Sequence, residues 1–83
     1  MFKIIWADNA WKALKKLDRF VSKRIYNKVG KLKTDPHRYL KKLVGSPYFC
    51  LRVGDYRVIV EVRKDVLQIL VLKVEHRKRI YKD

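Results

Sequence analysis

The sequence predicts an α+β fold of order β-α-α-β-β-β, in which a mostly antiparallel sheet carries a helical hairpin on one face. Two segments of the first half repeat apolar residues at helical spacing, and three segments of the second half are strand-like. Helices and strands that are kept apart along the chain favour α+β over α/β. With 83 residues, of which 48% are hydrophobic, the chain is long enough for a single domain, residues 1–83, and too short for two.

The first half of the chain is predicted to form one strand and two helices. Residues 2–6 (FKIIW) are strand-like. Asp8 is predicted to cap the first helix and Asp18 the second, because aspartate is a favoured N-cap residue. The apolar stripes of the two helices are Ala10, Leu14 and Leu17 in the first, and Val21, Ile25, Val29 and Leu32 in the second.

A connector is predicted between the helices and the remaining strands. Asp35-Pro36 should end the second helix, since the residue before a proline disfavours helical geometry. Residues 37–47 follow, with Gly45 and Pro47 as breakers and room for one short helical turn.

Residues 48–53, 56–63 and 66–75 are predicted to be strands, and the last, apolar almost throughout, should be central. Gly54-Asp55 is the expected turn of a hairpin, which places Arg52 opposite Arg57 on the sheet face away from the helices. Two facing arginines repel by roughly a few tenths to 1 kcal/mol. A bound phosphate would turn this repulsion into attraction, because guanidinium groups match phosphate oxygens. The alternative is that Arg52 reaches into solvent or pairs with Glu61 or Asp55.

The charge of the chain narrows the class of partner. Lys plus Arg number 22 against 8 Asp plus Glu, a net charge of +14. So large an excess predicts a nucleic acid, an anionic membrane face or an acidic protein as partner, and a merely soluble basic surface is the alternative. Cys50 is the single cysteine, which rules out an intramolecular disulfide and favours the reducing cytoplasm. The apolar runs of the chain are too short for a signal peptide or a membrane span, so no membrane association is expected.

The C-terminal segment VEHRKRIYKD, residues 74–83, suggests the chemistry. It leaves the strand that pairs with the one carrying Arg57, so arginines, an imidazole and a phenol can converge on one face. These groups can cleave RNA without a metal: a base deprotonates the ribose 2′-hydroxyl, cations stabilise the phosphorane, and an acid protonates the leaving 5′-oxygen. No acidic cluster at metal-ligand spacing is present, so neither a metal nor a cofactor is predicted.

The element order, the segment LRVGDYR and the ending HRKRIY together resemble the RelE/ParE toxin superfamily, in particular its RelE-type mRNA interferases. The resemblance covers nearly the whole chain. It implies a toxin of a type II toxin–antitoxin system that cleaves mRNA in the ribosomal A site, and an acidic RelB-like antitoxin that wraps around it. It also implies that Arg57 binds the scissile phosphate, that Arg77 stabilises it, and that Tyr81 stacks on or orients a base. His76 lies where some members carry a catalytic or supporting basic residue.

Further RNA contacts are expected from Arg52, Lys73, Arg79, Lys41 and Lys42. The family's lysines on the strand before the hairpin are replaced here by Tyr48 and Cys50. This leaves the general base open among Arg52, His76 and Tyr81, with His76 favoured because histidine titrates near neutral pH.

Two other functions remain open. A ParE-type toxin would share the fold but inhibit DNA gyrase, and the presence of Arg57, Arg77 and Tyr81 argues against it. A non-catalytic nucleic-acid-binding module would need no more than the net charge.

Overall fold

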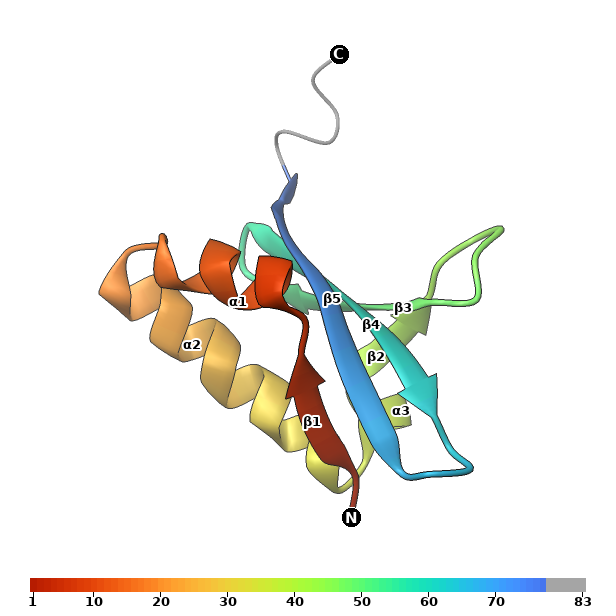
Figure 1. The fold of residues 1–83 in the computed structure, drawn as a ribbon. Helices are drawn as coiled ribbons and strands as arrows, with labels where there is room; N and C mark the ends of the chain where they lie inside the picture. Colours follow the sequence, from red (N-terminus) through yellow and green to blue (C-terminus); the bar gives the residue numbers. More distant parts are fainter. Residues whose placement is uncertain (78–83) are drawn as a thin grey trace.

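The computed structural model describes residues 1–77 and confirms the α+β class, with more elements than the sequence predicts (Figure 1). The elements in chain order are β1 (Lys3–Trp6), α1 (Asp8–Lys15), α2 (Arg19–Gly30), the 3₁₀ turn η1 (Lys31–Lys33), α3 (Pro36–Tyr39), β2 (Leu40–Lys42), β3 (Phe49–Val53), β4 (Tyr56–Arg63) and β5 (Gln68–His76). The five strands form one sheet in the order β1-β5-β4-β3-β2. Neighbouring strands are antiparallel except β1 and β5, which are parallel. β5 is therefore hydrogen-bonded on both sides, which confirms its predicted central place.

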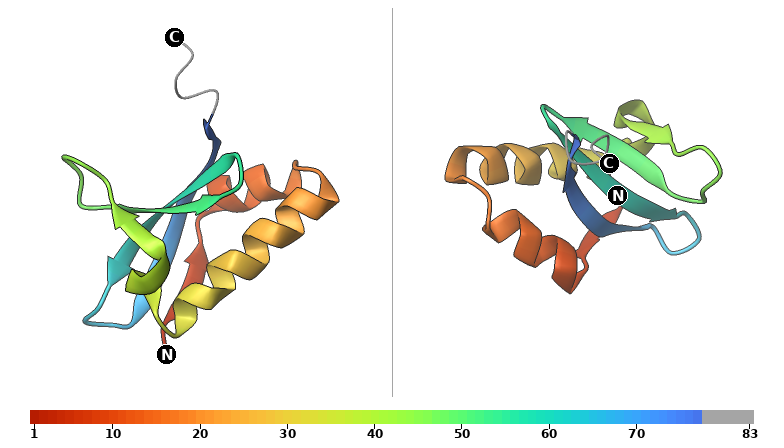
Figure 2. Two further views of the ribbon diagram at one scale, coloured as in Figure 1. Left: turned by 180° about the vertical axis from the view of Figure 1, so that it is seen from behind. Right: turned by 90° about the horizontal axis from the view of Figure 1, so that it is seen from above.

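Helices α1 and α2 cover one face of the sheet, as the further views in Figure 2 show. One hydrophobic core lies between them and the sheet. Its largest fully buried side chains are Ile25, Val29, Leu32, Leu51, Val58, Val60, Ile69 and Val71. We call the opposite side of the sheet the open face.

The helix boundaries differ in detail from the expected ones. Ala7 is the N-cap of α1, so Asp8 is not the cap but lies in the first turn, where its charge suits the helix dipole. Asp18 occupies the N-cap position of α2 as predicted, but its side chain makes no capping hydrogen bond. The helix ends at Gly30 rather than at Asp35-Pro36, and Pro36 starts α3 instead, at a position where a missing N–H costs little.

The β3–β4 hairpin turns at Gly54, as the sequence predicts. Gly54 has φ of +58°, and a Cβ atom there would lie 3.0 Å from Arg24 Nη1 on α2. A side chain at this position would therefore have a strained backbone and would meet the guanidinium group of Arg24. The turn before β5 spans residues 64–67 and includes Leu67 at φ of +51°, so the predicted strand start at Val66 is two residues too early.

Residues 40–42 correct the prediction of a connector. They form β2, which pairs antiparallel with β3 and places Lys41 opposite Cys50. A strand of three residues with two lysines is too short to show the alternation by which strands are predicted. β2 extends the open face at the edge of the sheet.

A β-bulge shifts the register between β4 and β5. Val60 pairs with Val71 but Ile59 pairs with Lys73, so Leu72 is an extra residue in β5. Since successive strand residues point to opposite faces, every residue after Leu72 changes face relative to an unbroken strand. Glu75 consequently lies opposite Arg57 on the open face, and His76 lies opposite Tyr56 on the helix-covered face.

Candidate functional site

A cavity of about 480 Å³ borders the open face near β2 and β3. Among the described residues its lining contains seven cationic side chains and no carboxylate. The lining residues are Lys28, Arg38, Tyr39, Lys41, Lys42, Leu43, Cys50, Arg52, Arg57 and Arg77. We call this space the cationic cavity. Cations drawn from several elements into one concave space suit a polyanion.

Arg52 and Arg57 face each other across β3 and β4, as predicted. Arg57 pairs with Glu75, whose Oε1 accepts a hydrogen bond from Arg57 Nη2 at 3.2 Å. Both side chains are partly shielded, with 27% of Arg57 and 32% of Glu75 exposed. The Nε of Arg57 is buried and has no hydrogen-bond partner among the described residues. Buried donors without a partner are uncommon in folded proteins.

The second glutamate of the open face is engaged elsewhere. Glu61 Oε2 accepts a hydrogen bond from Arg63 Nε at 3.1 Å. The predicted alternative, an Arg52–Glu61 pair, is therefore not formed among residues 1–77.

Cys50 and Ile59 form an apolar floor next to the arginines. They face each other across β3 and β4, and both are buried although they lie outside the main core. Burial raises the pKa of the Cys50 thiol above its usual value of 9.0, and the nearby Arg57 and Arg52 only partly oppose this. The thiol therefore keeps its proton at neutral pH, which argues against a role as nucleophile or base.

Five of the predicted site residues line the cationic cavity together: Arg52, Arg57, Arg77, Lys41 and Lys42. Arg77 reaches this place because its backbone N–H donates to Asp55 O at 2.7 Å, which continues the β4–β5 ladder beyond His76. Lys73 is exposed on the open face opposite Ile59, outside the lining.

His76 does not join the arginines. Its ring contacts the Tyr56 ring edge-to-face, with 4.9 Å between centroids, and Tyr56 packs against the main core. The expected convergence of this imidazole with Arg57 is therefore wrong, because the bulge at Leu72 turns it to the other face. Arg79 and Tyr81 lie outside the described residues.

Sequence reasoning missed three polar contributors to the cavity, Lys28, Arg38 and Tyr39. The guanidinium of Arg38 lies over the Tyr39 ring, 5.7 Å from its centroid. A cation beside an aromatic ring is a common platform for nucleic-acid bases. The adjacent Arg and Tyr in the connector were the only available signal, and such a pair is common in surface loops.

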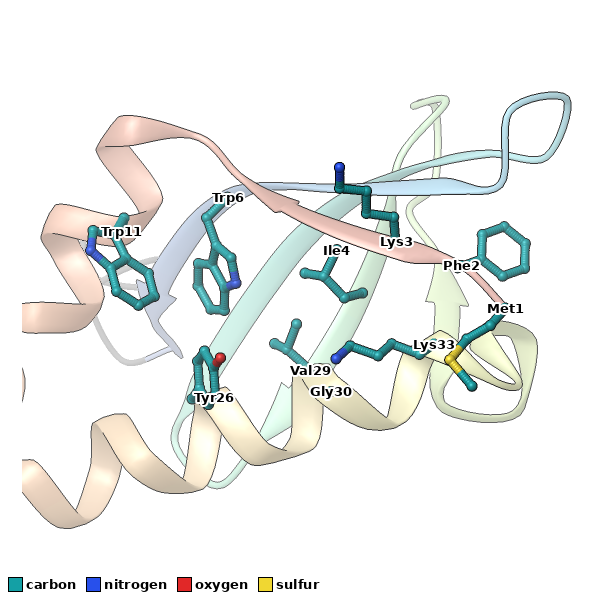
Figure 3. Close-up of a pocket in the computed structure, with 10 residues that line it drawn as sticks. All are labelled: Met1, Phe2, Lys3, Ile4, Trp6, Trp11, Tyr26, Val29, Gly30 and Lys33. Carbon is teal, nitrogen blue, oxygen red and sulfur yellow. The ribbon is translucent and has the colours of Figure 1, made fainter.

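A second cavity, of about 490 Å³, differs in character (Figure 3). It lies between β1 and α2, with Ile4 and Val29 at its centre. At one end the Trp6 ring stacks on Tyr26 at 6.1 Å and meets Trp11 edge-to-face at 5.4 Å. We call this space the aromatic groove. Its apolar lining suits a protein segment better than a phosphate.

Two further findings concern metals and membranes. Within residues 1–77, no group of three or more His, Cys, Asp or Glu side chains is placed to hold a metal ion. None of the helices in this part of the chain is long and apolar enough to cross a membrane.

Comparison with known proteins gives a consistent family. The family model for the ParE toxin of type II toxin–antitoxin systems matches residues 4–81. Toxin RelE3 of Methanocaldococcus jannaschii is 35% identical over 89 residues, which covers 95% of this chain and 94% of that protein.

Solved structures agree with this result. The toxin in the archaeal RelE–RelB complex of Pyrococcus horikoshii is 27% identical, with a TM-score of 0.80 and coverage of 94% of this chain and 97% of that one. A chain of the RelBE2 toxin–antitoxin complex of Mycobacterium tuberculosis has a TM-score of 0.84, covering 92% of this chain and 98% of its own. At 24% identity the latter shows the shared fold alone.

Proposed function

The chain belongs to the RelE/ParE superfamily of toxins from type II toxin–antitoxin systems, and we propose that it is an endoribonuclease that cleaves mRNA on the translating ribosome. The proposed reaction uses no metal. The ribose 2′-hydroxyl attacks the neighbouring phosphate, and the protein stabilises the phosphorane that forms. Its place of action would be the cytoplasm, where ribosomes translate.

The observation that carries this proposal is the meeting of Arg52, Arg57 and Arg77 in one cationic cavity. Its volume of about 480 Å³ lies within the range of small-ligand sites, so a nucleotide unit can enter it. Arg57 and Arg77 would hold the scissile phosphate, because guanidinium groups form strong bidentate contacts with phosphate oxygens. Their charges would then stabilise the phosphorane more than the ground state.

The remaining basic residues would bind the rest of the RNA. Arg52, Lys41 and Lys42 lie around the same cavity and would contact flanking phosphates. The affinity that these contacts contribute would fall as the salt concentration rises. Lys73 on the open face and Arg79 beyond the described residues would add to this attraction. The Arg38–Tyr39 pair offers one stacking surface, and Tyr81 would stack on or orient a further base.

Primer extension on an mRNA under translation tests the proposal. The protein should produce new 5′ ends within the reading frame when ribosomes are present, and none on the naked mRNA. A parallel supercoiling assay with DNA gyrase tests the ParE-type alternative, since the matching family model is that of the ParE toxin. Gyrase inhibition without mRNA cleavage would replace the proposal, and salt-sensitive RNA binding with neither effect would indicate a binding module.

A neutralising antitoxin would be the protein partner. The Pyrococcus horikoshii relative was solved as a RelE–RelB complex. For this chain, with its net charge of +14, we expect an acidic RelB-like partner that contributes an amphipathic segment. The aromatic groove can receive its apolar side chains, since Trp11 and Tyr26 are 40% and 52% exposed there. Lys3 and Lys33 line the same groove and would pair with its carboxylates.

A further inference from the structure

The proposed reaction needs a group that accepts the proton of the 2′-hydroxyl, and the inference below rests on that proposed function. The expected acceptor, His76, lies on the helix-covered face against Tyr56. Cys50 is on the correct face, but its buried thiol is shielded from solvent and keeps its proton. Neither residue can serve the site around Arg57.

Glu75 has the position that these residues lack. It lies directly opposite Arg57 in the ladder, and its Oε1 is 3.2 Å from Arg57 Nη2. Among the described residues, the other glutamate of the open face, Glu61, is paired with Arg63 at the far end of β4. Glu75 is also 32% exposed, so an RNA chain can reach it without unfolding the sheet.

We propose that Glu75 is the general base of this enzyme. A phosphate oxygen held by Arg57 would lie one guanidinium width from the Glu75 carboxylate, and the attacking 2′-hydroxyl belongs to the ribose that carries this phosphate. The carboxylate takes the proton of the 2′-hydroxyl, and the 2′-oxygen forms a bond to phosphorus. The bond from phosphorus to the 5′-oxygen breaks with its electron pair, and that oxygen takes up a proton from water. The products are a 2′,3′-cyclic phosphate and a 5′-hydroxyl.

The surrounding charges fit this role. Arg57 faces Glu75 from β4, Lys73 lies on the same face of β5, and Arg77 follows directly after β5 and lines the cationic cavity. From β3, Arg52 and the neutral Cys50 thiol complete the group. These cations would hold the scissile phosphate beside the carboxylate.

Single-turnover cleavage on programmed ribosomes, followed as a function of pH, tests this assignment. Glu75→Gln keeps the size of the side chain and an acceptor for Arg57 but cannot take the proton. Its cleavage rate should fall by about 10²–10⁴-fold, as for loss of a general base. The wild-type rate should rise with pH to a plateau, and this rise should vanish in Glu75→Gln. Glu75→Asp should cut slowly but retain the pH dependence.

Glu61→Gln is the matched control, since it neutralises the other glutamate of the open face, and it should cut at the wild-type rate. Thermal melting of each variant checks that it folds. A Glu75→Gln variant that cuts as fast as the wild type, or that slows but keeps the wild-type pH dependence, would overturn the role as base. Cleavage by neither wild type nor variants would overturn the proposed ribonuclease function, and this assignment with it.

Discussion

Replacement of Arg57 by alanine should separate activity from stability. The Arg57–Glu75 ion pair is partly exposed, so its loss costs about 1 kcal/mol at most. Removal of the repulsion with Arg52 returns roughly a few tenths to 1 kcal/mol. The net change in the free energy of unfolding should stay within about 1 kcal/mol, which corresponds to at most about 4–8 °C in Tm for a domain of this size. The loss of one donor to the phosphorane should instead slow cleavage by about 10²–10³-fold, or roughly 2.7–4 kcal/mol.

Arg63→Ala is the control for this experiment. Arg63 lies on the same strand and the same face, and it pairs with a glutamate at 3.1 Å, so the variant loses the same charge and a similar ion pair. It lies outside the cationic cavity, and its single-turnover cleavage rate should match that of the wild type. The reasoning is refuted if Arg57→Ala cuts at the wild-type rate, or if both variants slow equally, since equal losses would report net charge rather than a phosphate site.

The remaining predictions address other parts of the molecule. Arg77→Ala should slow cleavage on ribosomes by about 10²-fold or more, whereas His76→Ala, on the other face, should leave the rate of the chemical step unchanged. Tyr81→Phe should retain most activity and Tyr81→Ala lose most of it if the ring stacks on a base, which is worth roughly 1–3 kcal/mol; equal losses in single-turnover assays would indicate proton transfer instead. Trp11→Ala should weaken binding of the antitoxin by about tenfold or more in calorimetry, and unchanged affinity would exclude the aromatic groove as its site. Because the pKa of Cys50 is raised in the folded state, the folded protein holds this proton more tightly, so stability should fall as the pH rises above 9.0; urea titrations should show a smaller fall for Cys50→Ala.

The hairpin and its two facing arginines could be predicted from the sequence. A two-residue turn at Gly54-Asp55 fixes the register, and each further pair then follows by counting outward. This local rule sufficed to place Arg52 and Arg57 together on the face away from the helices. It required no knowledge of distant contacts.

The C-terminal half of the site could not be predicted in this way. Uninterrupted pairing from Arg63 and Gln68 would place Val74 opposite Arg57 and turn His76 to the open face. The extra residue Leu72 changes this, but a bulge within an apolar run leaves no mark in the pattern of residue types. The extra residue Leu72 is the reason that Arg57 pairs with Glu75 and that His76 lies on the helix-covered face.

The edge of the site was missed for a different reason. β2 is formed by pairing with β3 rather than by its own composition, since two of its three residues are lysines. Only the tertiary structure shows that this segment brings Lys41 and the preceding Arg38–Tyr39 pair to the cationic cavity. Short edge strands generally depend on their partner in this way.

The parallel pairing of β1 with β5 has a consequence for how the protein is made. The first strand in the chain finds its partner in the last, so β1 stays unpaired until β5 is present. Contacts between such distant segments form late and slowly. β5 also carries Glu75 and leads into Arg77, so folding is completed by the same strand that completes the site. We therefore expect a nascent or truncated chain that lacks β5 to be inactive. The toxin should become active only after nearly the whole domain has been synthesised.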